Sequence, residues 1–174
     1  WPRFDSPSLF GALLDQDAGG SWTIAPTEVA RATRRYVEAT NVLQTRFETG
    51  GGTGVLIDFM PVASEEDKKR WLQPEHELVR RLECEQGEVE LSVHFNPRPD
   101  YSRANVLVRN ARPLGLRIER GASLVTLLSD LELGPAAGGG VASRVRLRAG
   151  ESAAFSPTYS AEGPAVISPL GEHV

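Results

Sequence analysis

Glu88-Val89-Glu90-Leu91-Ser92-Val93-His94-Phe95-Asn96 is the stretch that decides the fold of this chain. Apolar and polar side chains alternate along it, and a period of two is typical of a half-buried antiparallel strand. The apolar face consists of Val89, Leu91, Val93 and Phe95. Residues 77–84 form a similar run, with Leu78, Leu82 and Cys84 on one side. The short glycine-containing link 85–87 predicts that these two strands form a hairpin.

The same alternation recurs along most of the chain. It predicts further strands at 21–25, 30–37, 41–49, 54–60, 105–110, 114–118, 123–128, 144–148 and 151–156. In the strand at 54–60, we expect Val55, Ile57 and Phe59 to share one face. Many short strands joined by Gly, Pro and Asp turns predict an all-β fold, a two-sheet antiparallel β-sandwich.

Helix is expected in only two short places. Ser6, followed by Pro7, is a candidate cap for a turn of helix that runs to Leu14. Ser64 begins a second candidate that ends at Leu72, with acidic residues in its first turn. The glycine-rich segment 134–140 is expected to be a flexible loop rather than a domain boundary.

Size and charge limit the classes of function. A chain of 174 residues is long enough for one domain with its own core, so residues 1–174 are expected to form a single domain. Its net charge of −4 argues against nucleic-acid binding, and no stretch is apolar enough to cross a bilayer. Cys84 is the only cysteine and is expected to be an inert core thiol. No signal peptide is visible, which favours the cytoplasm and leaves secretion open.

No arrangement of residues identifies a catalytic or metal site. The histidines His76, His94 and His173 are not spaced for metal binding, and no phosphate-binding loop or nucleophile motif occurs, so no cofactor is predicted. Asp58 lies on the same strand face as Leu56 and is expected to be partly buried. Because buried charges are normally paired, an ion pair with an arginine is favoured over catalysis. The alternating arginines of 144–148 are expected to be solvated or paired with acids on a neighbouring strand.

The first residues of the chain are the best candidates for ligand binding. Aromatic rings stack on the C–H faces of sugars, while Asp and Arg hold hydroxyl groups. Two prolines, Pro2 and Pro7, exclude a regular central strand there and stiffen the loop. The candidate substrate-binding residues are Trp1, Arg3, Phe4 and Asp5. For the other aromatic residues, packing is favoured over binding; these are Trp22, Tyr36, Trp71, Tyr101 and Tyr159.

Several separated motifs resemble one known family. They are Trp1-Pro2-Arg3-Phe4-Asp5-Ser6-Pro7-Ser8-Leu9-Phe10-Gly11-Ala12-Leu13-Leu14-Asp15, Thr33-Arg34-Arg35-Tyr36, Thr40-Asn41-Val42-Leu43-Gln44-Thr45, Asp58-Phe59-Met60-Pro61, Leu78-Val79-Arg80-Arg81, Gly87-Glu88-Val89-Glu90-Leu91 and 97–101. In this order they resemble the N-terminal, trehalase-like domain of glycoside hydrolase family 15, which includes bacterial glucoamylases, glucodextranases and trehalases. The resemblance covers about the first hundred residues; the last seventy are similar only in strand character.

The resemblance implies a large supersandwich of the galactose-mutarotase type, which packs against an (α/α)6 catalytic barrel. Family members carry their general acid and base on that barrel, and this chain has no run of paired helices that would form it. The family pattern has strands before the first motif, so residue 1 is expected to lie inside the natural domain. The loop of Arg3, Phe4 and Asp5 is implied to face the barrel and border its sugar pocket, with Trp1, Phe4 and Phe10 forming an apolar surface that the barrel covers.

Three functions are therefore open. The first is a non-catalytic module of a family 15 hydrolase that acts on an α-glucoside such as trehalose or a maltodextrin, with the catalytic domain as its partner. The second is an independent carbohydrate-binding module. The third is a mutarotase-like sugar enzyme, for which His94 is the only reasonable starting residue.

Overall fold

The structure is a computed structural model that describes residues 1, 3–71, 74, 76–103, 107–111, 115–120 and 123–160. Its elements are β1 (Ser21–Pro26), β2 (Arg31–Tyr36), β3 (Leu43–Glu48), β4 (Gly52–Phe59), α1 (Glu65–Arg70), β5 (Val79–Asn96), β6 (Leu107–Asn110), β7 (Leu116–Arg120), β8 (Ser123–Ser129), β9 (Gly134–Pro135), β10 (Val141–Arg148) and β11 (Ser152–Ser160). The predictions that fall on Pro2, Leu72, Leu114, His173 and residues 105–106 lie outside the described residues.

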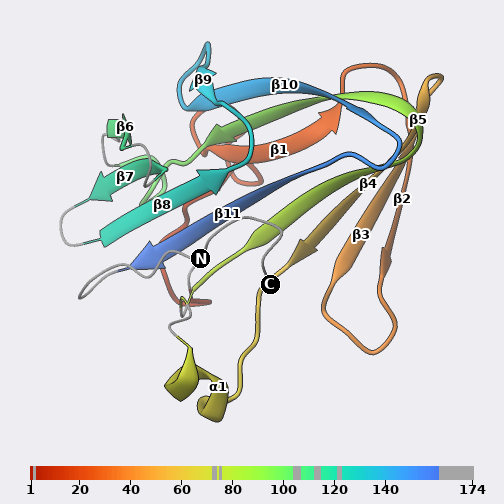
Figure 1. Cartoon of the computed structure of the whole chain (residues 1–174). Helices are drawn as coiled ribbons and strands as arrows, with labels where there is room; N and C mark the ends of the chain where they lie inside the picture. Colours follow the sequence, from red (N-terminus) through yellow and green to blue (C-terminus); the bar gives the residue numbers. More distant parts are fainter. Residues whose placement is uncertain are drawn as a thin grey trace.

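The strands form an all-β antiparallel sandwich whose two layers share one strand (Figure 1). The larger layer has the order β2-β3-β4-β5-β11-β8-β7-β6. In the smaller layer, the second half of β5 lies between β1 and β10, and β9 pairs with β10. Every strand expected from alternation has a counterpart here, so the predicted fold class is confirmed.

The predicted hairpin at 77–96 is wrong, because β5 runs through this region as one strand of 18 residues. Its first half pairs with β4 and β11, and its second half pairs with β1 and β10. At the crossing, Gln86 pairs with Thr53 and Cys84 with Gly54, so Glu85 is the extra residue of a bulge. A bulge bends a strand without reversing it, which lets β5 leave one layer and join the other.

Gly87 permits this bend. Its φ of 68° lies in the left-handed region, and a Cβ atom there would be 2.2 Å from the carbonyl oxygen of Gly51. The sequence carries a trace of the bulge, because the buried hydrophobic residues of β5 are even-numbered up to Cys84 and odd-numbered from Val89 onward. A plain strand keeps one parity on each face, so the change of phase marks an inserted residue.

The core lies between the two layers and is built from the inward faces of the strands. Its members include Ile24, Phe47, Leu56, Leu82, Cys84, Val89, Leu91, Val93, Phe95, Ile118, Val125, Leu127, Leu147 and Phe155. The expected apolar face of β5 agrees with this list. In β4, Val55, Ile57 and Phe59 share one face as expected, but the core lies on the opposite face. Leu56, paired with the buried Leu82, faces the core, whereas Val55 pairs with Glu83 on the other face. Apolar residues on both faces of β4 made its alternation ambiguous.

The ion-pair predictions for the strands are confirmed. Asp58 accepts from the Nε atom of Arg80 at 2.9 Å, and both side chains are largely buried. The Arg80 guanidinium also donates to the carbonyl of Trp22 and lies 4.8 Å from the centre of its ring. On β10, Arg146 pairs with Glu90 at 2.9 Å.

One of the two expected helices is present. Ser64 caps α1 by accepting the backbone N–H of Asp67 at 3.1 Å, as predicted. No side chain of α1 is buried, and its segment projects from the sandwich (Figure 1). The loop expected at 134–140 is partly strand, because Gly134–Pro135 pairs with β10. Among the described helical residues, none belong to a helix long and apolar enough to span a membrane.

Candidate functional site

The N-terminal segment is an irregular loop fastened to the sandwich by backbone hydrogen bonds. The helix expected to begin at Ser6 is absent from residues 6–14. The Ser6 hydroxyl accepts the backbone N–H of Arg3, which precedes it, and does not cap a following helix. Leu9 is buried, and its carbonyl accepts the N–H of Arg98 at 2.8 Å. The loop therefore lies against the segment that follows β5.

The four predicted binding residues occupy two different environments. Trp1 is partly buried and packs edge-on against Tyr159, with ring centroids 5.9 Å apart. Arg3 and Asp5 form an exposed ion pair of 3.0 Å with each other. Phe4, between them, is fully exposed. The structure thus brings Arg3 and Asp5 together and turns Trp1 toward the core.

The expected apolar surface of Trp1, Phe4 and Phe10 is wrong in part. Phe10 is partly buried, and its ring lies 5.7 Å from Phe95 and 6.2 Å from Trp22. These contacts place Phe10 in the core because its neighbours on β1 and β5 are aromatic. Of the three residues, Phe4 alone is fully exposed; Leu13 and Leu14, further along the same segment, are exposed as well.

A small pocket opens beside this loop. Its volume is about 80 Å³, and it lies between residues 6–9, residues 99–100 and the strands β7, β8 and β11. The polar and aromatic lining groups are Trp1, Tyr159, Ser6, Ser8, Ser123 and Asp100. The hydroxyl groups of Ser123 and Tyr159 are 3.0 Å apart. Aromatic rings with hydroxyl and carboxylate groups suit a sugar, but ligand pockets start at roughly 300 Å³, so this one admits only the edge of a ring.

The wall of the pocket includes a strained turn. Asp100, Tyr101 and Ser102 have φ values of 56°, 55° and 66°, the left-handed region that side chains with a Cβ avoid. Each such residue costs about 1–2 kcal/mol, and strain of this kind is concentrated at functional sites. The turn is held by hydrogen bonds from Tyr101 to Ser8 and from Arg103 to Asp100. Sequence reasoning missed it because the turn contains no glycine.

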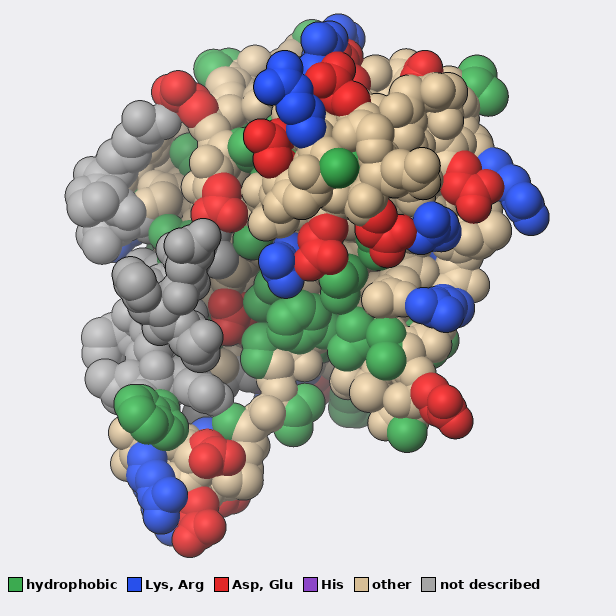
Figure 2. Space-filling view, turned by 45° about the vertical axis from the view of Figure 1, so that its right-hand side comes forward, with side chains coloured by type: hydrophobic (Ala, Val, Ile, Leu, Met, Phe, Trp, Pro, Cys, Tyr) green, Lys and Arg blue, Asp and Glu red, His purple; other side chains and the backbone are tan. Residues whose placement is uncertain are grey.

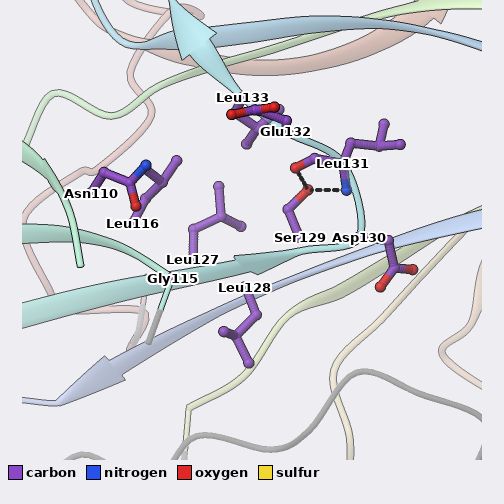
Figure 3. Close-up of a pocket in the computed structure, with 10 residues that line it drawn as sticks. All are labelled: Asn110, Gly115, Leu116, Leu127, Leu128, Ser129, Asp130, Leu131, Glu132 and Leu133. Carbon is purple, nitrogen blue, oxygen red and sulfur yellow. Dashed lines mark hydrogen bonds between the residues drawn. The ribbon is translucent and has the colours of Figure 1, made fainter. Parts of the chain in front are cut away.

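A larger hollow of about 660 Å³ lies at the side of the sandwich, between β6–β8 and the link to β9 (Figure 3). Half of its ten lining residues are leucines: Leu116, Leu127, Leu128, Leu131 and Leu133. The hydroxyl of Ser129 donates to the carbonyl of Leu131 and accepts its N–H. None of the described lining residues is aromatic, so this hollow offers little to a sugar.

The acids of this hollow do not form a facing pair. Asp130 points away from Glu132 in Figure 3, and its carboxylate accepts the N–H of Ala154 at 2.8 Å. Paired carboxylates of a glycosidase must face each other across the substrate. In the part of the chain that the structure describes, no group of three or more His, Cys, Asp or Glu could hold a metal. Burial raises the pKa of Cys84, which agrees with an inert thiol.

Comparison with known proteins gives a consistent result. A family model described as "Trehalase-like, N-terminal" matches residues 1–131. Trehalase 1 of Sulfolobus acidocaldarius is 31% identical over 133 residues, which is 75% of this chain and 21% of that protein. The trehalase of Mycobacterium tuberculosis is 33% identical over 114 residues, or 59% of this chain and 16% of that protein. Trehalase 2 of Sulfolobus acidocaldarius is 42% identical over 62 residues, or 36% and 10%. The aligned part is thus a small fraction of each relative, and the relatives are archaeal as well as bacterial.

Proposed function

The chain belongs to the family of trehalase-like N-terminal domains. From this premise we propose that it is a non-catalytic module of a family 15 glycoside hydrolase that acts on an α-glucoside such as trehalose. Its partner is an (α/α)6 catalytic domain of the same polypeptide. The module supports that domain and adds a wall near its sugar pocket.

The share of each relative that aligns is the observation that carries this proposal. Proteins named trehalases match this chain over only 10% to 21% of their length, which leaves ample room for a separate catalytic domain. The larger hollow of the sandwich has leucine walls and no facing carboxylates, so it is a poor site for glycoside hydrolysis.

The wall near the sugar is assigned to the loop of Arg3, Phe4 and Asp5. All three residues are exposed, and the ion pair between Arg3 and Asp5 orients two groups that can hold sugar hydroxyls. Phe4 offers a free ring face for stacking. Trp1, packed on Tyr159, anchors the base of the loop rather than presenting its ring freely.

Activity at two chain lengths tests the proposal. The protein expressed at the full length of its reading frame is expected to release glucose from trehalose, while the 174-residue chain alone releases none. In the longer protein, Phe4→Ala and Asp5→Asn are expected to raise KM, whereas Arg144→Ala, an exposed change on β10, leaves it unchanged. Glucose release by the 174-residue chain at a comparable rate would refute a non-catalytic role.

An independent carbohydrate-binding module is the second candidate, favoured by the pocket that Trp1, Tyr159 and Asp100 line. Calorimetry of the chain with trehalose and with malto-oligosaccharides separates the two functions. Saturable binding that is lost in Trp1→Ala would support the binding module. No observation favours a mutarotase-like enzyme, because His94 lines neither the small pocket beside the N-terminal loop nor the leucine-lined hollow.

A further inference from the structure

Strand β2 is an open edge of the larger layer. Among the described strands it pairs only with β3, at the end of the strand order, and it lies at the outer margin of the sandwich in Figure 1. All six of its residues are exposed, so it is covered on neither face. Strand edges of this kind are templates for pairing with another chain, and natural proteins normally shorten, cover or charge them.

The register determines which backbone groups are free to pair. The N–H of Val37 donates to the carbonyl of Val42 at 2.9 Å, so these two residues form a hydrogen-bonded pair of the β2–β3 hairpin. Because such pairs alternate in an antiparallel ladder, Arg31, Thr33 and Arg35 direct their N–H and C=O groups toward β3. The same groups of Ala32, Arg34 and Tyr36 therefore point to the open edge.

A basic hollow adjoins this edge. Its volume is about 290 Å³, and its lining residues are Thr33, Arg34, Arg35, Gln44, Arg46, Val55 and Glu85. Arg46 forms ion pairs with Glu85 and Glu48. Arg35 donates to the amide oxygen of Gln44 at 3.1 Å, and in the described part of the chain no carboxylate pairs with Arg34 or Arg35. Successive side chains of a strand point to opposite faces, so Arg35 lies on the face of Gln44 and Arg46, and Arg34 lies on the other face. The edge therefore carries unpaired positive charge on both faces.

The surrounding surface is mixed in charge. Figure 2 brings forward the right-hand side of Figure 1, which holds β2. It shows a hydrophobic patch with acidic and basic side chains around it. Most charged side chains of β3 and of the first half of β5 are in ion pairs, such as Arg81 with Glu83 at 2.8 Å. Arg34 and Arg35, in contrast, keep unpaired positive charge next to the unpaired backbone groups of β2.

We propose that β2 binds an extended, carboxylate-bearing peptide segment by strand addition. The backbone of that segment pairs with Ala32, Arg34 and Tyr36, and its acidic side chains meet the guanidinium groups of Arg34 and Arg35. A second copy of this chain fits poorly, because pairing β2 with another β2 brings arginines against arginines. This inference does not depend on the proposed function and concerns a different face from the N-terminal loop.

Amide exchange measured by NMR tests strand addition directly. The probe is a short, end-capped peptide in which pairs of adjacent glutamates alternate with pairs of threonines, so that both faces of the added strand carry carboxylates. The matched control peptide has glutamine in place of glutamate. In the 174-residue chain alone, the amides of Ala32, Arg34 and Tyr36 are expected to exchange fast. The acidic peptide is expected to slow their exchange at least tenfold, with little change at Thr33 and Arg35, whose N–H groups already bond to β3.

Two variants separate the backbone contribution from the charge contribution. Ala32→Pro removes an N–H that points to the open edge, so the β2–β3 ladder is retained while one bond to the peptide is lost. Arg34→Glu with Arg35→Glu reverses the charge. Each is expected to weaken peptide binding about tenfold or more, while Arg144→Glu on β10 leaves it unchanged. Circular dichroism checks that the variants fold, and Arg34→Gln with Arg35→Gln replaces the reversed pair if that one does not.

Three results would overturn the inference. If the arginine changes weaken peptide binding but Ala32→Pro does not, the peptide binds to the basic side chains without pairing with the backbone of β2. Absence of binding at millimolar peptide would mean that the arginines serve only to protect the edge. A dimer in sedimentation experiments that Ala32→Pro dissociates would assign the edge to a second copy of the chain.

Discussion

At the scale of single residues, the ion pair between Asp58 and Arg80 is the least exposed of the ion pairs between described residues. Their side chains are only 20% and 15% exposed, so breaking the pair leaves a charge in the interior. Asp58→Asn is expected to lower the free energy of unfolding by about 2–3 kcal/mol. Urea denaturation measures this loss.

The exposed pair of Arg3 and Asp5 is the matched control for that change. Its side chains are 65% and 51% exposed, and Asp5→Asn is expected to change the unfolding free energy by less than about 0.5 kcal/mol. Equal losses in the two variants would show that burial of Asp58 and Arg80 has no energetic effect.

Glu90 gives a prediction for pH dependence. A hydrogen bond from Arg146, followed by one from Thr27, holds the pKa of this carboxyl below the usual range of glutamate. A lowered pKa in the folded state stabilises the protein above the ordinary pKa, and this contribution disappears as pH falls through the lowered value. Arg146→Ala is therefore expected to flatten the loss of stability on acidification. Urea midpoints between about pH 3 and pH 7 test this, and Arg103→Ala should keep the original slope.

At the scale of elements, the bend in β5 depends on Gly87. Gly87→Ala places a Cβ in contact with the carbonyl of Gly51 and forces a residue with a side chain into the left-handed region. We expect a loss of at least about 2 kcal/mol in unfolding free energy. Gly150 also has a positive φ, 88°, but open space around it, so Gly150→Ala should cost only about 1 kcal/mol. Similar losses in both would contradict the role of the close approach.

The same strand shows how far the sequence alone could lead. Alternation predicted both halves of β5 correctly, because the period of a half-buried strand is a local property. Whether the link at 85–87 reverses or only bends the chain is decided by distant partners, since Gly52 and Thr53 on β4 pair with Gly87 and Gln86 of the link. A local pattern does not contain that information, although the change of phase between Cys84 and Val89 hints at it.

The candidate site was predictable to a similar extent. Arg3 and Asp5 lie two residues apart, and their association in one exposed loop follows from the sequence. The pocket beside them was not predictable, because Asp100 and Tyr159 come from segments far along the chain. The interior position of Phe10 depends in the same way on Trp22 and Phe95, which belong to other strands.

At the scale of the whole molecule, the shared strand β5 joins the two layers into one unit. Leu82 lies where β5 pairs with β4, and Leu91 lies where it pairs with β1 and β10; both are buried. Leu82→Ala and Leu91→Ala are each expected to cost about 2–5 kcal/mol and to shift one common transition. Tryptophan fluorescence and far-ultraviolet circular dichroism should give the same midpoint in each variant. Separate transitions would mean that the layers unfold independently.

The projecting segment of α1 has a practical consequence. Trypsin cleaves after Lys68, Lys69 and Arg70, and because α1 buries no side chain, cleavage there removes no core contact. The two pieces are expected to remain associated, since β5 on the second piece pairs with both β1 and β4 on the first. Nicked protein should elute from gel filtration as one species and separate only in denaturant, whereas separation in plain buffer would contradict this. The chain thus offers a natural split point for fragment complementation, where reassembly of two halves reports on folding.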